Sequence, residues 1–296
     1  MAKETKRKKK GAPQPKVTTS PSDRMIDDQS IPVSSNRRFL WFIFGGIFFG
    51  SMAVQTYLRI PPSTAPVLTY EVVNEYEHDA TAFTQGLLID NGRLYESTGR
   101  LKESTIRLVE IASGNPIIKK PLPASYFAEG ITVYRNKIYQ LTFQNKKMLV
   151  YNKDSLELIE ERDFPFDGWG LTSDSDYLIH SDGTSTIRFL DPDTFTVVEK
   201  ITVRDGKRKI SEINELEYYD KRIYANVWHE DYILQIIPAT GRVSARIELE
   251  GLLNPPSGDK EACLNGIAVD EKTNTFYLTG KLWPKVFEVK FVEKTK

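Results

Sequence analysis

The chain has 296 residues, in which 40 Lys or Arg balance 40 Asp or Glu, and it contains one cysteine. This length allows one globular domain with a large core plus appendages. The lone Cys263 excludes an intramolecular disulfide, and we interpret it as a buried apolar residue rather than a nucleophile. The three histidines, His78, His180 and His229, form no HxH or HxxxH pair, which argues against a His-rich metal site.

The balanced charge conceals a basic N-terminal tail. Residues 1–38 carry ten Lys or Arg and four Asp or Glu, so the tail is near +6 and the remainder near −6. The tail is rich in Pro, Ser, Gln and Thr, which predicts a disordered, solvated segment. The basic run Lys6–Lys10 has two interpretations, a nucleic-acid patch or a cytosolic tail beside a membrane. We favour the second and expect no nucleic-acid partner.

Residues 39–58 follow the tail and contain no charged side chain. Twenty helical residues would span roughly 30 Å, which is about the thickness of a bilayer core. Arg37 and Arg38 precede this segment, and Trp41 and Tyr57 lie near its ends, as the positive-inside rule and the aromatic belt predict. We therefore expect a single-pass signal anchor with a cytosolic N-terminus and a folded domain in the ER or Golgi lumen or the extracytosolic space.

A cleaved signal peptide is the alternative interpretation of the same segment. Ser51-Met52-Ala53 offers small residues at a plausible cleavage site, although the preceding charged region is long for a signal peptide. After the apolar segment, the Pro-rich residues 59–66 predict a stiff linker. The folded domain is predicted to cover residues 67–296.

A short motif recurs through the folded domain: a polar or aromatic residue, then usually Gly, then a branched apolar residue. The five copies are Gln85-Gly86-Leu87, Glu129-Gly130-Ile131, Trp169-Gly170-Leu171, Asn214-Glu215-Leu216 and Asn265-Gly266-Ile267. Their middle residues are 44, 40, 45 and 51 positions apart. Each copy is followed by two further short runs of β-branched or aromatic residues. This period and these runs predict an all-β, five-bladed β-propeller.

The last repeat, from Asn265, is too short to supply four strands. The alternating run 68–76, which precedes the first repeat, looks like a strand without a blade of its own. We therefore predict that this N-terminal strand closes the last blade, so that only short sheet edges stay exposed.

The repeat alignment also predicts a functional site. In a propeller, the first strand of each blade lines the central channel, so the residues before the middle position of each motif should share one level. The clusters that end the second strands should lie at the same mouth. The predicted set is Gln85, Glu129, Trp169, Asn214 and Asn265, with Phe143, Trp228 and Lys281. This set combines one carboxylate, one amine, carboxamides and aromatic rings. Such charged and polar groups are costly to bury in a hydrophobic core, so the set indicates a functional site.

Several segments resemble the plant-type glutaminyl-peptide cyclotransferases. They are Phe83-Thr-Gln-Gly-Leu87, Leu94-Tyr-Glu-Ser-Thr-Gly99, Phe127-Ala-Glu-Gly-Ile-Thr132, Gly168-Trp-Gly-Leu-Thr172, Ile213-Asn-Glu-Leu-Glu217, Ala225-Asn-Val-Trp228 and Thr279-Gly-Lys-Leu-Trp-Pro284. The resemblance covers roughly residues 68–291 in the right order. It implies a five-bladed propeller that converts an N-terminal glutamine to pyroglutamate and releases ammonia. It adds Phe83 to the candidate site.

Two positions depart from that family's pattern. Phe143 stands where the family usually carries Trp, and Ala128 stands where Gly often precedes the Glu. Phe143 keeps an apolar wall but lacks an indole donor. The basic tail and the apolar segment that follows it lie outside the resemblance.

The resemblance and the residue chemistry together suggest roles. Glu129 is the candidate general base, and burial beside Trp169 and Trp228 would raise its pKa towards a useful range. Lys281 is the candidate stabiliser of the oxyanion, while Gln85 and Asn214 would hold the carboxamide and peptide groups. We expect metal-independent catalysis, no cofactor and no metal ligand. The sequence leaves open a structural cation in the central channel.

Two other classes of function are consistent with the same pattern. One is a membrane-tethered, non-catalytic propeller that binds peptide ends or a protein partner. The other is a propeller hydrolase of the lactonase type, which would need a metal held by several acidic residues. The first positions of the five motif copies supply only one acidic residue, Glu129. We expect a monomer that acts on peptides or proteins with an N-terminal glutamine.

Overall fold

The computed structural model describes residues 65–253 and 259–294, and every regular element in these residues is a β-strand. The prediction of an all-β domain is confirmed. No helix in the described residues is long and apolar enough to cross a membrane. The predicted tail (1–38) and anchor (39–58) lie outside these residues.

Most strands belong to five antiparallel four-stranded units. Unit 1 contains β2 (Thr84–Asp90), β3 (Arg93–Thr98), β4 (Thr105–Val109) and β5 (Pro116–Pro121). Unit 2 contains β6 (Ala128–Tyr134), β7 (Lys137–Thr142), β8 (Lys147–Asn152) and β9 (Leu158–Asp163). Unit 3 contains β10 (Leu171–Ser173), β11 (Leu178–Ser181), β12 (Thr186–Leu190) and β13 (Val197–Thr202). A small hairpin, β14 (Arg204–Asp205) and β15 (Arg208–Lys209), follows unit 3.

The remaining two units share one eight-stranded sheet. Unit 4 contains β16 (Ile213–Tyr219), β17 (Arg222–Val227), β18 (Tyr232–Ile236) and β19 (Val243–Glu248). Unit 5 contains β20 (Leu264–Asp270), β21 (Thr275–Gly280), β22 (Lys285–Glu293) and the N-terminal β1 (Val67–Glu77). Strand β1 pairs antiparallel with β22 over most of its length, as the sequence predicted, and begins with a short parallel pairing to β19.

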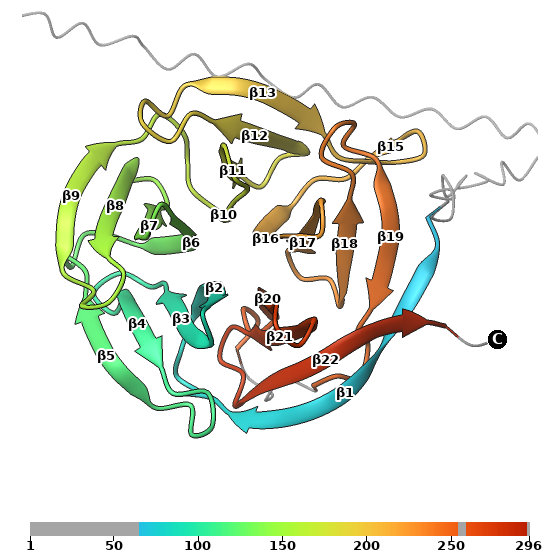
Figure 1. Ribbon diagram of the computed structural model, residues 1–296, viewed down its shortest axis with the longest axis horizontal. Helices are drawn as coiled ribbons and strands as arrows, with labels where there is room; N and C mark the ends of the chain where they lie inside the picture. The colour runs from blue at the N-terminus through green and yellow to red at the C-terminus, as the bar shows by residue number, and fades with distance from the viewer. Residues whose placement is uncertain (1–64, 254–258, 295–296) are drawn as a thin grey trace, which may run out of the picture. The chain divides into compact units, whose positions relative to one another are not determined.

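The five units surround a common axis in chain order (Figure 1). The first strand of each unit lies nearest the axis, and the fourth strand lies at the periphery (Figure 1). Because β1 joins β22, segments from the two ends of the described chain complete the same unit. The arrangement brings five strands that are distant in sequence to one central region.

Hydrophobic clusters fill the spaces between neighbouring units. One cluster packs Tyr95 and Ile106 of unit 1 against Ile131 of unit 2, and another packs Leu87 of unit 1 against Tyr277 of unit 5. The three remaining junctions have equivalent clusters. Fully burying one such side chain stabilises a fold by about 1.5–3 kcal/mol, so the junctions hold the ring together.

The repeated motif marks the closest approach of the innermost segments. A Cβ atom on Gly130 would lie 2.5 Å from the backbone nitrogen of Leu171, and a Cβ on Gly170 would lie 2.0 Å from the backbone oxygen of Asn214. Only glycine fits at these two positions. This steric limit explains why glycine recurs in the middle of the motif.

Glu215 occupies the same motif position in unit 4 and behaves differently. Its carboxyl accepts hydrogen bonds from the Leu87 N–H (3.3 Å) of unit 1 and the Ile267 N–H (2.9 Å) of unit 5. The side chain therefore links three units near the axis. Burial and the neighbouring Glu217 raise the pKa of Glu215 well above its ordinary value.

Candidate active site

The innermost strands carry β-bulges at the repeated motif. The strand register shifts between Thr84 and Gly86 in β2 and between Ala128 and Ile131 in β6. Equivalent shifts occur in β16 and β20. A bulge bends a strand and redirects a side chain that would otherwise alternate between sheet faces. The first polar residue of each of these motifs lies at such a bulge.

One cavity of about 760 Å³ is formed by residues from all five units. Eight of the nine predicted site residues line it: Phe83, Gln85, Glu129, Phe143, Trp169, Asn214, Trp228 and Lys281. Its volume is within the range of ligand pockets, roughly 300–1,000 Å³. The structure therefore brings to one cavity seven residues that the repeat alignment indicated, together with Phe83, which the family resemblance added.

Glu129 is the buried acid of this cavity, with 5% of the residue exposed. Burial raises the pKa of its carboxyl well above the ordinary value, and the positive charge of Lys281 opposes this rise. Within the described residues, no group donates a hydrogen bond to the carboxyl. A desolvated carboxyl without a fixed partner is able to exchange a proton with a ligand.

Lys281 is also buried, with 4% of the residue exposed, and it follows strand β21 directly. Its ammonium lies 5.0 Å from the ring centroid of Phe83 and 6.0 Å from that of Trp228. The backbone N–H of Lys281 donates to the carbonyl of Cys263 (2.9 Å), and the next N–H, of Leu282, donates to Ala82 (2.7 Å). These bonds hold the ammonium between aromatic rings at the wall of the cavity.

Cys263 contributes to the site through its backbone carbonyl. The side chain is buried and forms no disulfide, and burial raises the pKa of its thiol. Its interpretation as a buried apolar residue is consistent with this environment.

Two tryptophans form one wall of the cavity. The rings of Trp169 and Trp228 meet edge to face, with centroids 5.7 Å apart and planes at 89°. Trp169 packs on Gly183, where a Cβ would lie 2.7 Å from the indole. The indole N–H of Trp228 is buried and has no hydrogen-bond partner in the described part of the chain. It is a donor available to a ligand.

The carboxamides divide into two groups. Gln85 and Asn214 line the cavity, and Asn214 Oδ1 is buried without a hydrogen-bond partner among the described residues. Asn265 does not line the cavity, although its motif position is equivalent. Its side-chain nitrogen donates to the carbonyl of Thr84 (2.9 Å) and to Oε1 of Gln85 (3.3 Å). Asn265 therefore orients the side chain of Gln85 without lining the cavity itself.

The sequence did not predict Phe127 as a site residue. Its ring completes a second aromatic wall of the cavity. Its ring contacts Phe83 and Phe143, with centroid distances of 6.2 Å in both cases. The signal was available: Phe127 precedes Glu129 by two positions, as Phe83 precedes Gln85. The other lining residues that were not predicted are Arg100, Leu101, Ser125, Gln144, Asn145 and Glu261.

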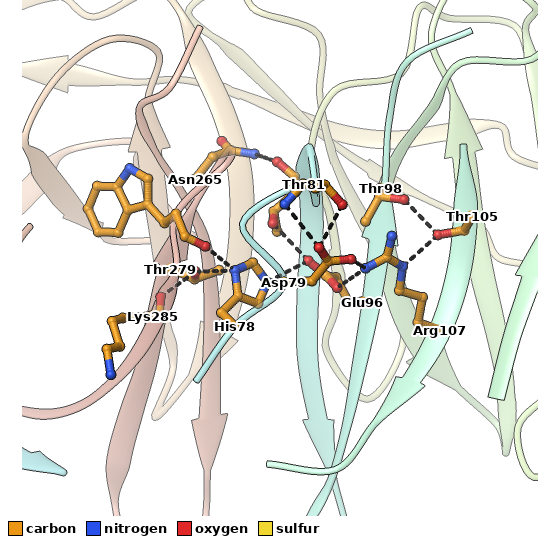
Figure 2. Close-up of polar contacts among 12 residues, drawn as sticks. His78, Asp79, Thr81, Glu96, Thr98, Thr105, Arg107, Asn265, Thr279 and Lys285 are labelled. Carbon is orange, nitrogen blue, oxygen red and sulfur yellow. Dashed lines mark hydrogen bonds and ion pairs between the residues drawn. The ribbon is translucent and has the colours of Figure 1, made fainter. Parts of the chain in front are cut away.

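A buried polar network lies between units 1 and 5 (Figure 2). His78 Nε2 lies 2.9 Å from Glu96 Oε1, and His78 Nδ1 lies 2.6 Å from the carbonyl of Trp283. Arg107 donates to Asp79 (2.9 Å) and to the other Glu96 oxygen (3.5 Å). The network connects the segment before Phe83 to the segment after Lys281.

Comparison with known proteins identifies the family. The sequence model described as glutamine cyclotransferase matches residues 47–291. The chain belongs to the glutamine cyclotransferase family. The resemblance that the motifs indicated is therefore confirmed.

Two relatives are similar to this chain over most of its length. A glutaminyl-peptide cyclotransferase from Arabidopsis thaliana is 35% identical over 292 residues, which cover 88% of this chain and 89% of the relative. The crystal structure of Myxococcus xanthus glutaminyl cyclase matches with a TM-score of 0.73 at 33% identity, covering 78% of this chain and 100% of the other.

The described residues of this chain contain no group of three or more His, Cys, Asp or Glu side chains that could hold a metal ion. The charged groups that line the cavity are the Lys281 ammonium, the Arg100 guanidinium and the carboxyls of Glu129 and Glu261. Its chemistry is that of an acid–base and hydrogen-bonding site.

Proposed function

We propose that this chain is a glutaminyl-peptide cyclotransferase that converts the N-terminal glutamine of peptides or proteins to pyroglutamate and releases ammonia. The observation that carries the proposal is the buried Glu129 carboxyl and the Lys281 ammonium in one aromatic-walled cavity. Family membership and the similarity to a glutaminyl-peptide cyclotransferase and a glutaminyl cyclase support it.

The reaction forms one C–N bond and breaks another. The neutral α-amine of the substrate attacks the carbon of its own side-chain carboxamide, and a tetrahedral intermediate with an oxyanion forms. Glu129 takes a proton from the attacking nitrogen and gives it to the departing amide nitrogen, which leaves as ammonia. The carboxyl is thereby returned to its starting state. The raised pKa of Glu129 suits both steps, because the group must accept and then release the same proton.

The other polar groups stabilise and orient the reacting atoms. Lys281, which is buried, supplies positive charge to the oxyanion, and such an interaction is stronger in a buried site than in water. The buried Trp228 N–H and Asn214 Oδ1, which have no partner among the described residues, provide one donor and one acceptor for the substrate. Gln85, oriented by Asn265, provides a further carboxamide.

The aromatic walls restrict the flexible glutamine side chain. Trp169, Trp228, Phe83 and Phe127 surround the polar groups. A slot of this kind selects the folded conformer in which amine and carboxamide carbon are adjacent, and preorganised intramolecular reactions gain much of their rate in this way.

Ammonia release tests the proposal directly. The full chain should release one ammonia from each Gln-initiated peptide, with a mass loss of the peptide equal to ammonia. The matched control is the same peptide with an acetylated N-terminus, whose blocked amine cannot attack. Equal release from both peptides would indicate a glutaminase, and release from neither would reject the cyclase and leave a binding function.

We further propose that catalysis needs no metal. Two points support this proposal. The described residues contain no metal-binding cluster, and side chains of the cavity supply the proton transfers and the positive charge in the proposed mechanism. Dialysis against a strong chelator should leave the rate within about twofold, and a loss that added metal restores would reject this proposal.

The five four-stranded units around one axis support the proposal of a five-bladed β-propeller. A monomer is proposed as the active form, because one chain suffices to supply the acid, the ammonium and the aromatic rings that the proposed reaction uses. The apolar sequence 39–58 supports a membrane anchor with the catalytic domain in the ER or Golgi lumen or the extracytosolic space. Light scattering tests the monomer, and alkaline extraction with protease protection of intact membranes tests the anchor and its orientation.

A further inference from the structure

The cavity is larger than the reaction requires. Its volume of about 760 Å³ exceeds that of a single glutaminyl residue, and the catalytic groups occupy only part of its lining. Leu101, Gln144 and Asn145 line it without a role in the proposed chemistry. They come from the β3–β4 and β7–β8 loops, which are neighbours at the junction of units 1 and 2.

Leu101 is an exposed apolar residue on an otherwise well-anchored loop. The residue is 57% exposed, although hydrogen bonds hold the loop on both sides of it. Gly99 N–H donates to the Phe83 carbonyl (2.8 Å), and Lys102 N–H donates to the Ala124 carbonyl (3.1 Å). Ser104 Oγ donates to the Arg100 carbonyl (2.8 Å) and accepts from the Ala128 N–H (3.0 Å), next to Glu129.

The backbone on both sides of Leu101 is strained. Arg100 has φ +79° and Lys102 has φ +70°, in the left-handed region that residues other than glycine seldom adopt. Each such residue costs on the order of 1 kcal/mol or more and persists where surrounding contacts impose it. The loop therefore holds Leu101 at the edge of the cavity at an energetic cost.

Leu101 shares the lining of the cavity with two phenyl rings. Phe127 packs on Gly99, at the start of the loop that carries Leu101, and its ring contacts Phe143. The guanidinium of Arg100 stacks on Phe83 at 4.5 Å from the ring centroid and forms an ion pair with Asp259 (2.6 Å). Asp259 therefore balances the charge of the guanidinium, and Arg100 presents no unpaired cation to a substrate side chain that lies against Leu101.

We propose that Leu101, Phe127 and Phe143 form a subsite for the side chain of the second residue of the substrate, and that this subsite selects a large apolar residue. The inference rests on the proposed function, because it assumes glutamine in the catalytic slot. Consecutive Cα atoms are 3.8 Å apart, so the second residue must lie directly beside that slot. Leu101 and the catalytic groups line the same cavity.

The test compares kcat/KM for two peptides, Gln-Leu-Ala-amide and Gln-Ser-Ala-amide, with glutamine amide as a substrate that has no second residue. We expect the leucine peptide to be preferred about fivefold to twentyfold, as partial burial of one apolar side chain allows. The preference should lie in KM, because the contact exists before and during the reaction.

The Leu101→Ser variant should reduce the ratio of the two peptides to about one or two. The matched control is Leu158→Ser, because Leu158 is 53% exposed on β9 and does not line the cavity; it should keep the native ratio. Thermal unfolding of both variants checks that each is folded.

The outcomes separate the two proposals. Release of ammonia from all three substrates with equal kcat/KM for both peptides overturns the subsite and leaves the cyclase intact. A native ratio in Leu101→Ser does the same. No ammonia from any substrate, including glutamine amide, overturns the proposed function and the subsite with it.

Discussion

At the scale of single residues, the site depends on a carboxyl that is almost completely withdrawn from water. We predict that Glu129→Gln lowers turnover by about 10²–10⁴-fold, the usual contribution of a general acid or base. The fold should persist, because an uncharged carboxamide costs less to bury than a carboxylate. Ammonia release and thermal unfolding measure the two effects.

The matched control for this substitution is Glu161→Gln, which changes an exposed glutamate on β9 in the same unit. It should leave turnover unchanged. Turnover of Glu129→Gln within threefold of the native protein would contradict the assignment of Glu129 as the base.

The pH dependence gives a second test at this scale. Burial raises the pKa of Glu129, so the active carboxylate accumulates only above the ordinary carboxyl range and the rate should rise with pH on the acid side. Lys281 lowers this pKa, and its removal must therefore raise it. We predict that Lys281→Met reduces kcat by about 10²–10³-fold and moves the acid limb of the kcat/KM profile to higher pH.

The substrate amine also titrates, with a pKa near ~7.7–8.0, but its contribution is the same for both proteins and cancels in the comparison. An acid limb that stays in place, or that moves to lower pH, would show that Lys281 does not act on Glu129.

The sequence predicted most of these residues because they occupy equivalent positions in a repeat. An equivalent position in the repeat does not determine where the side chain points, however. Asn265 has the same motif position as Gln85, yet its side chain bonds to Gln85 instead of lining the cavity. Arg100 and Leu101 were not predicted because their position depends on positive φ angles at residues other than glycine, which no local pattern indicates.

At the scale of elements, the innermost segments must approach closely for their side chains to share a cavity. We predict that Gly130→Ala destabilises the protein by about 1–3 kcal/mol, because its Cβ would meet the backbone of Leu171 and Trp169 at 2.5 and 2.8 Å. Turnover should fall as well, since Glu129 is the adjacent residue. Denaturant unfolding and ammonia release measure these changes.

Gly92→Ala is the control, because φ is +77° at Gly92 but a Cβ there would meet nothing within 4 Å. This variant should lose stability through strain alone and keep native turnover. Native turnover in Gly130→Ala would show that the close contact of units 2 and 3 does not position the acid.

The sequence indicated the inner strands of each unit better than the outer ones. The three runs recognised in each repeat are largely buried, whereas the fourth strands β5, β9 and β13 have mostly exposed residues. Such strands are specified by pairing with their neighbours, and their hydrophobic signal is weak. Glu215 shows a related limit: the motif placed it correctly, but the bonds across the axis depend on the assembled ring.

At the scale of the whole molecule, closure of the ring brings Phe83 and Lys281 together. The sequence predicted the part of this closure made by β1 and β22, because an unpaired strand preceded the first repeat and the last repeat was short. It did not predict the network of His78, Glu96 and Arg107 (Figure 2), because these residues follow no period and the bond of His78 to Glu96 depends on how the segment before β2 packs on unit 1.

This network should make stability depend on pH in both directions. Burial would raise the pKa of Glu96, but His78, Arg107 and Thr84 together lower it below 4.5, so its contribution is lost as pH falls through the lowered value. Burial would lower the pKa of His78, but Glu96 and the Trp283 carbonyl raise it above 6.5. The contribution of His78 is therefore complete below pH 6.5 and is lost as pH rises through the raised value.

We predict that His78→Gln lowers the free energy of unfolding by about 1.5–3 kcal/mol near pH 6, because it removes one of the two cations beside the buried Glu96 carboxylate and leaves only Arg107. The loss should shrink as pH rises, since the native protein then also lacks the imidazolium. Lys285→Gln is the control: it removes the solvent-exposed ion pair with Glu77, which also joins β1 to β22, and should have a small effect that does not vary over this range. Denaturant unfolding from pH 5 to 9 distinguishes the two. A His78→Gln penalty that is constant with pH, or that grows as pH rises, would mean that the imidazole acts only as a neutral hydrogen-bonding group and that the ring is not closed by a buried ion pair.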